Sequence, residues 1–240
     1  MIRIIAAREA KALFSSPQAW IVFAIFQAIL AWIFLARLDA FLGVQAKLQH
    51  LVNPPGVTEW IIAPLFSAAS MIFLMIIPLF TMRLIAEEAR NQTLPLLFSA
   101  PVSSLEIVLG KYLGLLVFLC AAIGLVLFMA LTLLLGGKID FGLLFSNVLG
   151  LFFAAASFAA LGLYISCLTS HPYLAGIGGI GALLGLWAVR FGSGGFFRAI
   201  SPSDHFDRFN QGLVDTGDIA YFLLAIVLFL MLSAWRLEQR

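Results

Sequence analysis

The chain has 240 residues, of which 62% are hydrophobic and 11% are charged, and its formal net charge is +2. Its mean hydropathy of +1.07 lies outside the range of soluble domains of this length. The composition therefore excludes a soluble domain and predicts an integral membrane protein, for which we expect no nucleic-acid partner.

Six apolar windows are long enough to cross a bilayer. A hydrocarbon core about 30 Å thick needs roughly 20 apolar residues per helix, and such windows recur at residues 17–37, 60–82, 105–135, 144–169, 172–191 and 219–236. Stretches such as IVFAIFQAILAWIF are apolar on every side, whereas the strands of a membrane barrel alternate. We therefore predict an all-α polytopic protein, with a single domain of six transmembrane helices over residues 17–240.

The first 16 residues, MIRIIAAREAKALFSS, predict an amphipathic interfacial helix that forms an elbow before the first span. Its apolar side chains are expected to face lipid, and its charged side chains water or lipid phosphate. The apolar set includes Ile2, Ile5, Leu13 and Phe14, and the charged set is Arg3, Arg8, Glu9 and Lys11.

Six spans place both termini on one side of the membrane. Three basic residues precede the first span, and the loop after that span carries only Lys47. The positive-inside rule therefore predicts cytoplasmic termini. Lys111 and Arg190 lie close to span ends, where their side chains are expected to reach the headgroup region.

Residues 83–101, RLIAEEARNQTLPLLFSAP, lie between the second and third spans and so on the cytoplasmic side. Good helix formers open the segment, Pro95 and Pro101 interrupt it, and Ser103 or Ser104 can cap the third span. Taken alone, the charges suit an ordinary solvated loop. The apolar residues favour a surface that contacts a partner; they are Leu84, Ile85, Leu94, Leu96, Leu97 and Phe98.

The pattern R-L-I-A-E-E-x-R-x-x-T-L-x-L-L-x-S-A-P-V-S-x-x-E-I-V-L-G-K over residues 83–111 resembles the membrane subunits of the second export-type class of ABC transporters. A second stretch, SPSDHFDRFNQGLVDTGDIAYF over residues 201–222, is similar to the gliding-motility GldF-like group of that class. Most members have Gly where this chain has Gln92, and Glu where it has Pro95. In that family the segment after the second span is the coupling helix, which docks in a groove of a separate ATPase. The resemblance implies this role for Glu87, Glu88, Arg90, Asn91, Thr93 and Leu94.

We expect no catalytic chemistry from this chain itself. A phosphate-binding G-x-x-x-x-G-K-[ST] motif is absent from the sequence, since the Gly-Lys pair at 137–138 is followed by Ile139. ATP and Mg²⁺ are therefore expected in the partner ATPase, with no cofactor, metal or catalytic residue in this chain. Asp204, His205 and Asp207 suggest a metal site, but adjacent residues of a helix point away from one another.

Glycines within the spans indicate close helix packing. Gly110-xxx-Gly114 opens the third span, and the fifth span carries Gly178, Gly181 and Gly185. Packing within one chain is the first interpretation of both sets. The family resemblance implies instead that the first and fifth spans of two permeases face each other, which would place the second set at a dimer seam.

The outer segment, residues 192–218, joins the last two spans and is too apolar for a simple linker. It predicts a short helix capped by Ser203 or Asp204, in which Asp204 and Arg208 pair at i, i+4.

These features predict a multi-pass permease subunit of an ATP-driven ABC exporter in the bacterial inner membrane. Its expected partners are two copies of a cytoplasmic ABC ATPase, a second copy of itself or a related permease, and a periplasmic or auxiliary membrane protein. The alternative is a non-transporting membrane scaffold that anchors a cytoplasmic protein. Because the spans contain few ionisable side chains, an amphiphile is a better candidate substrate than a small ion.

Overall fold

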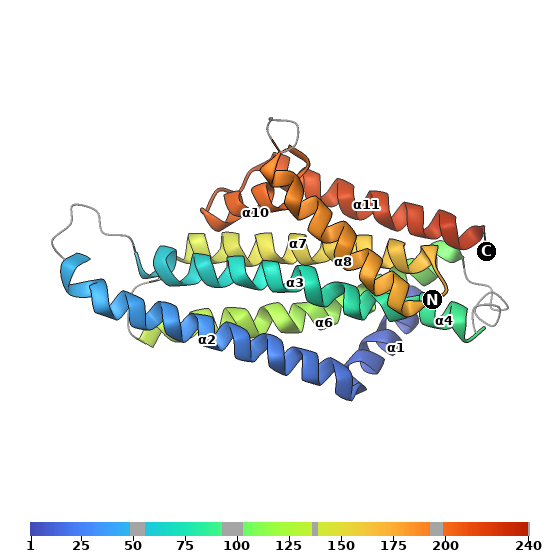
Figure 1. Ribbon diagram of the computed structural model, residues 1–240, viewed down its shortest axis with the longest axis horizontal. Helices are drawn as coiled ribbons and strands as arrows, with labels where there is room; N and C mark the ends of the chain where they lie inside the picture. Colours follow the sequence, from blue (N-terminus) through green and yellow to red (C-terminus); the bar gives the residue numbers. More distant parts are fainter. Residues whose placement is uncertain (49–55, 93–102, 136–138, 193–198, 240) are drawn as a thin grey trace.

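The computed structural model describes residues 1–48, 56–92, 103–135, 139–192 and 199–239, and every regular element in these ranges is helical. Six helices are long and apolar enough to cross a membrane, which confirms the six predicted spans. Most of them run along the long axis of the molecule, and the fifth crosses it obliquely (Figure 1). These helices are α2 (Pro17–Leu48), α3 (Ala63–Leu84), α6 (Ser104–Thr132), α7 (Phe141–Leu168), α8 (Pro172–Ala188) and α11 (Thr216–Glu238).

Shorter helices extend or connect these spans. Both chain termini lie at one end of the bundle, which we call the terminal end, and the other end is called the opposite end (Figure 1). The helices α1 and α4 lie at the terminal end, and α10 joins the last two spans. The short elements are α1 (Ile2–Ser15), η1 (Thr58–Ile62), α4 (Ala86–Arg90), η2 (Leu133–Leu135), η3 (Val189–Phe191) and α10 (Pro202–Asn210).

The helix α7 forms the centre of the bundle. In its most apolar window 67% of the residues are buried, compared with 17% in α2 and 22% in α8 and in α11. Small side chains at residues 154–157 and 159–160 of α7 are buried and allow α3 and α11 to pack against it. The outer helices expose large apolar side chains, such as Trp32 of α2 and Ile177 of α8. Such faces require lipid or another subunit to cover them.

Side-chain caps fix where three of the spans begin. Ser103 accepts a hydrogen bond from the amide of Glu106, and the Glu106 carboxylate accepts one from the amide of Ser103, so α6 starts with a capping box. This confirms one of the two predicted caps. Asp140 and Asp215 cap α7 and α11 more simply, because only the N-cap carboxylate accepts hydrogen bonds, from amides of the first turn.

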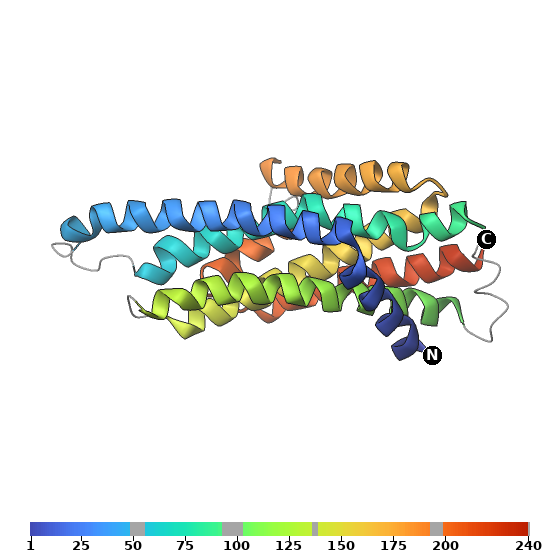
Figure 2. The ribbon, with the colours of Figure 1, turned by 90° about the horizontal axis from the view of Figure 1, so that it is seen from below.

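The helix α1 turns away from α2 at Ser16, whose backbone is extended (ψ 119°), and α2 begins at Pro17. Figure 2 shows that α1 is set at an angle to α2 and crosses the bundle at the terminal end. Its principal packing partner is α6. The predicted N-terminal helix is therefore present as a separate element that rests on a membrane span.

The crossing of α1 and α6 depends on two glycines. A Cβ atom at Gly110 would lie 2.7 Å from the Cβ of Ile5, and one at Gly114 would lie 2.7 Å from the Cβ of Glu9. The Gly110-xxx-Gly114 motif therefore packs against another helix of the same chain, as predicted from the sequence. The orientation predicted for α1 is wrong at Ile5 and Glu9, because these residues face α6 instead of lipid and water.

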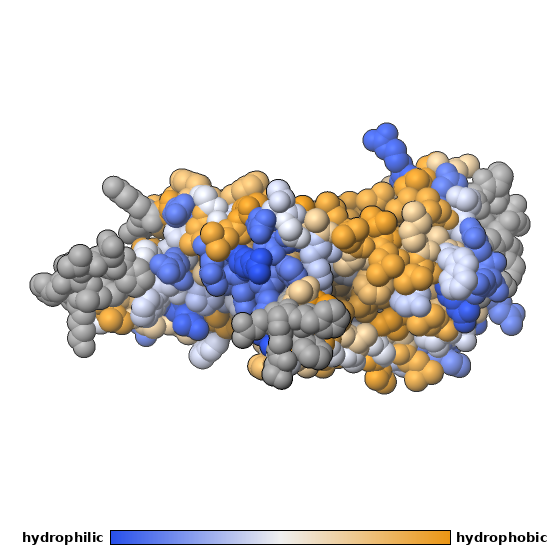
Figure 3. Space-filling view, turned by 90° about the horizontal axis from the view of Figure 1, so that it is seen from above, coloured by the Kyte–Doolittle hydropathy of each residue, from blue (hydrophilic) through white to orange (hydrophobic). Residues whose placement is uncertain are grey.

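The helix α10 lies beside α7 and not beyond its end (Figure 1). The hydroxyl of Ser146 on α7 donates to the carbonyl oxygen of Phe209, 2.7 Å away, and the Phe209 side chain is fully buried. Figure 3 shows polar residues gathered on this face of the molecule, next to the apolar surface of the spans. The predicted caps of this helix are wrong, because the helix begins earlier, with Ser201 as N-cap and Pro202 in the first turn.

Candidate functional site

The candidate site lies at the terminal end, where α3 stops and α4 begins. Between them Ile85 leaves helical geometry, with φ −125° and ψ −41°. A helix start leaves backbone N–H groups without partners inside the helix. Here the hydroxyl oxygen of Ser166, on α7, accepts hydrogen bonds from the amides of Ile85 (3.3 Å) and Ala86 (3.0 Å). The corner between α3 and α4 is therefore held against α7.

The side chain of Lys111 on α6 connects two further helices to this corner. Its Nζ atom lies 2.8 Å from Oε1 of Glu9 on α1 and 2.7 Å from Oε1 of Glu88 on α4. Lys111 is only 2% exposed. A buried ammonium group requires pairing, and the two carboxylates provide it. The expectation that Lys111 reaches the headgroups is therefore wrong, and we call this arrangement the Glu9–Lys111–Glu88 cluster.

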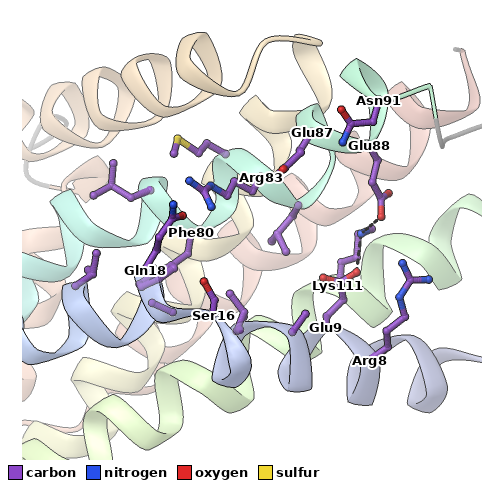
Figure 4. Close-up of a pocket in the computed structure, with 17 residues that line it drawn as sticks. Arg8, Glu9, Ser16, Gln18, Phe80, Arg83, Glu87, Glu88, Asn91 and Lys111 are labelled. Carbon is purple, nitrogen blue, oxygen red and sulfur yellow. Dashed lines mark hydrogen bonds and ion pairs between the residues drawn. The ribbon is translucent and has the colours of Figure 1, made fainter.

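A cavity of about 580 Å³ adjoins the cluster. Figure 4 shows it between α1 and the start of α2 on one side and the end of α3 with α4 on the other. Val22, Leu79 and Phe80 supply part of an apolar wall, and Arg8 and Arg83 are among its charged residues. We call it the elbow cavity.

The structure divides the predicted coupling residues into two groups. Glu87, Arg90 and Asn91 are exposed at the terminal end, where a partner protein can contact them. Glu88 points inward and pairs with Lys111. Thr93 and Leu94 lie outside the described residues, so their role stays a prediction. The helix α4 thus has one face toward solvent and one toward the bundle.

Gln92 follows α4 in a conformation that is rare for its residue type. Its φ is +55°, in the left-handed region that glycine adopts without steric cost. This is the position at which the resembling family has Gly. The chain therefore departs from the family pattern at a point where its own backbone conformation favours glycine.

Two of the three predicted seam glycines of α8, Gly181 and Gly185, are not used for packing within the described part of the chain. A Cβ at Gly181 or Gly185 would have no described neighbour within 4 Å, and one at Gly178 would lie 3.3 Å from the Cγ2 of Ile165. Gly181 and Gly185 thus leave an open surface on α8. Their assignment to a dimer seam stays a prediction.

At the opposite end, the residues considered for a metal site point to different partners. Arg190 lies 3.0 Å from Asp207 and 4.0 Å from Asp204. Burial raises the pKa of the Asp207 carboxyl, and the nearby guanidinium of Arg190 opposes this rise only in part. His205 instead contacts Asp218, with 2.5 Å between Nδ1 and Oδ1. The side chains therefore form ion pairs and a hydrogen bond that hold α10 in place, and Arg190 pairs with α10 instead of reaching the headgroups.

Asp218 anchors α10 to the start of α11. It is 1% exposed, and its Oδ1 atom also lies 3.4 Å from Nη1 of Arg208. The predicted pair of Asp204 and Arg208 is wrong, because Asp204 is directed to Arg190 and Arg208 to Asp218.

The sequence analysis did not identify two partners of α4, Lys111 and Ser166, or Glu9, which pairs with Lys111. Glu9 and Lys111 are 102 residues apart, and Ser166 is 80 residues from Ala86. A lysine inside an apolar span signals a buried partner, and this signal could have identified Lys111. A serine in a membrane helix is too common to identify Ser166 in the same way.

Comparison with protein families gives a match over residues 3–240 to the family described as ABC-2 family transporter protein. Comparison with curated proteins gives no match. The family match includes every helix of the bundle together with α1, α4 and the residues of the candidate site.

Proposed function

Because the chain belongs to the ABC-2 family of transporter proteins, and is thus a multi-pass permease subunit of an ABC transporter, we propose that it couples ATP hydrolysis to export or mechanical displacement. A separate ABC ATPase binds ATP and Mg²⁺ and supplies the energy. The terminal end of the bundle faces this ATPase in the cytoplasm, and the bundle lies in the bacterial inner membrane. The three basic residues before the first span support this orientation.

The observation that carries the proposal is the attachment of α4 to four other helices. The chain joins it to α3, Ser166 binds its first amides to α7, and Lys111 links Glu88 to α6 and to α1. Packed elements with several fixed contacts move as units when one of them is displaced. A protein that pushes α4 therefore acts on several spans at once.

The solvent face of α4 is the proposed docking surface for the ATPase. Glu87, Arg90 and Asn91 are exposed on it, with carboxylate, guanidinium and amide groups that suit a polar protein groove. We assign Thr93 and Leu94 to the same surface, on the strength of the family pattern alone.

We further propose that two permease chains and two ATPase subunits form the transporter. The weak burial of α2 and α8, and the open surface at Gly181 and Gly185, favour a second copy or a related permease beside them. The stretch at residues 201–222 supports placement in the gliding-motility GldF-like group. A periplasmic or auxiliary membrane protein would bind at the opposite end.

The transported substrate is proposed to be an amphiphile. The described spans present mostly apolar surface, and Lys111, which lies inside one of them, is already paired with two carboxylates. A bare ion would therefore find little compensation for its lost hydration. A lipid-like molecule or an apolar peptide can keep its apolar part in the bilayer.

The proposal is tested with two variants of the reconstituted complex. The docking variant, Glu87→Ala with Asn91→Ala, is expected to lose binding of the ATPase. The cluster variant, Glu88→Gln with Lys111→Gln, is expected to keep that binding and to lose most of the stimulation of ATP turnover by the permease. Glu238→Gln, an exposed change at the same end, is the control and should behave as wild type.

The same measurements decide between transport coupling and the scaffold alternative. A scaffold holds its partner without altering the partner's chemistry. If the wild-type permease binds the ATPase but leaves ATP turnover unchanged, or if the cluster variant stimulates turnover as well as wild type, coupling through α4 is wrong.

A further inference from the structure

The elbow cavity has a two-part lining that includes the cluster together with Glu87 and Asn91 of the proposed docking surface, but extends beyond them. One part is apolar and consists of the first turns of α2, with Ala19 and Val22, and the last turns of α3, with Leu79 and Phe80. These turns belong to membrane-spanning helices, so this part of the wall continues the surface that faces the hydrocarbon core. The other part is polar and lies on α1 and α4. The cavity therefore suits a molecule with an apolar body and a polar head.

Two exposed arginines of the polar part, Arg8 and Arg83, favour a head group that carries a phosphate. Lys111 is already paired with Glu9 and Glu88. Glu87 is the remaining carboxylate of the lining. Arg8 and Arg83 are both exposed, and in the part of the chain that the structure describes neither guanidinium forms an ion pair or a side-chain hydrogen bond. A guanidinium group matches the oxygen geometry of a phosphate, to which it can donate two hydrogen bonds.

The position of Arg83 brings the two parts of the lining together. Figure 4 shows its side chain above Phe80 and Gln18, in the space between α3 and the start of α2. Its guanidinium therefore lies at the boundary between the apolar wall and the polar groups of the cavity. In a bilayer this is the level at which lipid phosphates meet the ends of the spans.

We infer that the elbow cavity binds one phospholipid from the leaflet at the terminal end. Its phosphodiester is bound by Arg83, with Arg8 contributing from α1, and its acyl chains lie along Val22, Leu79 and Phe80. A segment of the ATPase is a poorer occupant, because the apolar wall belongs to the membrane spans and a soluble protein does not enter the bilayer.

The ligand is tested by native mass spectrometry of the full-length permease in detergent, without the ATPase. Three probes separate the sources of the signal: dioctanoyl phosphatidylglycerol, dioctanoylglycerol, which lacks the phosphate, and glycerophosphate, which lacks the acyl chains. We expect the phospholipid to bind roughly tenfold more tightly than either of the other two. Equal binding of dioctanoylglycerol, or of glycerophosphate, would overturn the inference.

The site is tested by matched arginine variants. Arg83→Gln is expected to weaken phospholipid binding roughly tenfold, whereas Arg90→Gln, an exposed change on α4 outside the cavity, leaves it unchanged. Arg8→Gln and Arg3→Gln form a second pair on α1, of which only the first lines the cavity. Ala12→Trp adds a bulky side chain within the lining and should exclude the lipid even if both arginines are present.

Two outcomes contradict this assignment. Equal binding by the Arg83→Gln and Arg90→Gln variants, when both unfold at the temperature of wild type, would show that the lipid sits elsewhere. Displacement of the lipid by the ATPase, together with loss of complex assembly in Arg83→Gln, would make the cavity part of the ATPase groove. The first result does not bear on the coupling role of the Glu9–Lys111–Glu88 cluster, since that binding assay contains no ATPase. The second uses the ATPase and moves its docking surface to the cavity, but it leaves the stimulation of ATP turnover through the cluster to be measured separately.

Discussion

Lys111 of α6 and Glu88 of α4 lie 2.7 Å apart, and their ion pair joins a membrane-spanning helix to a helix that also faces solvent. The same ammonium group lies 2.8 Å from Glu9 of α1. A single buried cation thus connects three elements of the terminal end that are far apart in the sequence. The stability of this end and the response of the spans to a partner are therefore expected to depend on the same side chain.

Replacing Lys111 with Met should destabilise the permease by about 3–5 kcal/mol, because two largely buried carboxylates would then lack a cation. Glu88→Gln should cost less, since Glu9 still pairs with the ammonium group. The double variant, Lys111→Met with Glu88→Gln, should lose less stability than the two single variants lose together. Unfolding in detergent, followed for all three variants, measures this coupling, and strictly additive losses would contradict a direct interaction.

Ser166→Ala should weaken the corner between α3 and α4. The change leaves the amides of Ile85 and Ala86 without their acceptor, which costs about 1–3 kcal/mol when the groups stay buried. Ser157→Ala on the same helix is the control, because the Ser157 hydroxyl donates to the carbonyl oxygen of Ala154 on its own helix and so joins no second element of the described chain. Hydrogen exchange at α4 should accelerate in the first variant and stay as in wild type in the second.

Gly114→Ala should separate α1 from α6. The new Cβ would lie 2.7 Å from the Cβ of Glu9 and 2.9 Å from the carbonyl oxygen of Ala6, closer than packed atoms approach. We expect a lower unfolding temperature and faster proteolysis of the N-terminal helix. Gly124→Ala lies on the same helix with no described neighbour within 4 Å, so it should be neutral or slightly stabilising. Similar behaviour of the two variants would refute the packing role of Gly114.

Gln92→Gly should stabilise the end of α4 by about 1 kcal/mol, because glycine adopts the φ of +55° without the steric cost that a Cβ imposes. Asn91→Gly is the matched control. Asn91 has an ordinary φ of −81°, so glycine relieves no steric cost there and only makes the end of α4 less ordered. Hydrogen exchange of the α4 amides provides the measurement. Faster exchange in Gln92→Gly than in wild type would show that the left-handed conformation does not limit this turn.

The spans and their ends could be predicted from sequence because local physics determines them. Long apolar windows dictate membrane helices, and the capping box of Ser103 and Glu106 is complete within four residues. The Gly110-xxx-Gly114 motif also indicated close packing, although not that α1 is the partner. For the spans and the cap, the interacting groups are close in sequence or the bilayer alone decides the outcome; for the glycine motif only the need for a close neighbour is local, and the neighbour itself is not.

The contacts of the candidate site could not be predicted in this way. The sequence pattern placed Glu88 in a group facing the ATPase, but its direction depends on Lys111, which belongs to another helix. The orientation of Glu9 was wrong for the same reason, since an amphipathic pattern cannot reveal that a buried cation lies beneath the helix. The cap of α10 was misplaced because several residues in its first turn are capable of capping.

The most direct test of the account is a distance measurement across the bundle during ATP binding. Spin labels are placed at the exposed residues Leu135 and Leu213, and the exposed Cys120 is replaced by Ser. The distance between the two labels reports on the opposite end of the permease in the reconstituted complex. We predict that ATP changes this distance in wild type and leaves it unchanged in the Glu88→Gln, Lys111→Gln variant, which still binds the ATPase. The same ATP-dependent change in both proteins would contradict coupling through the Glu9–Lys111–Glu88 cluster.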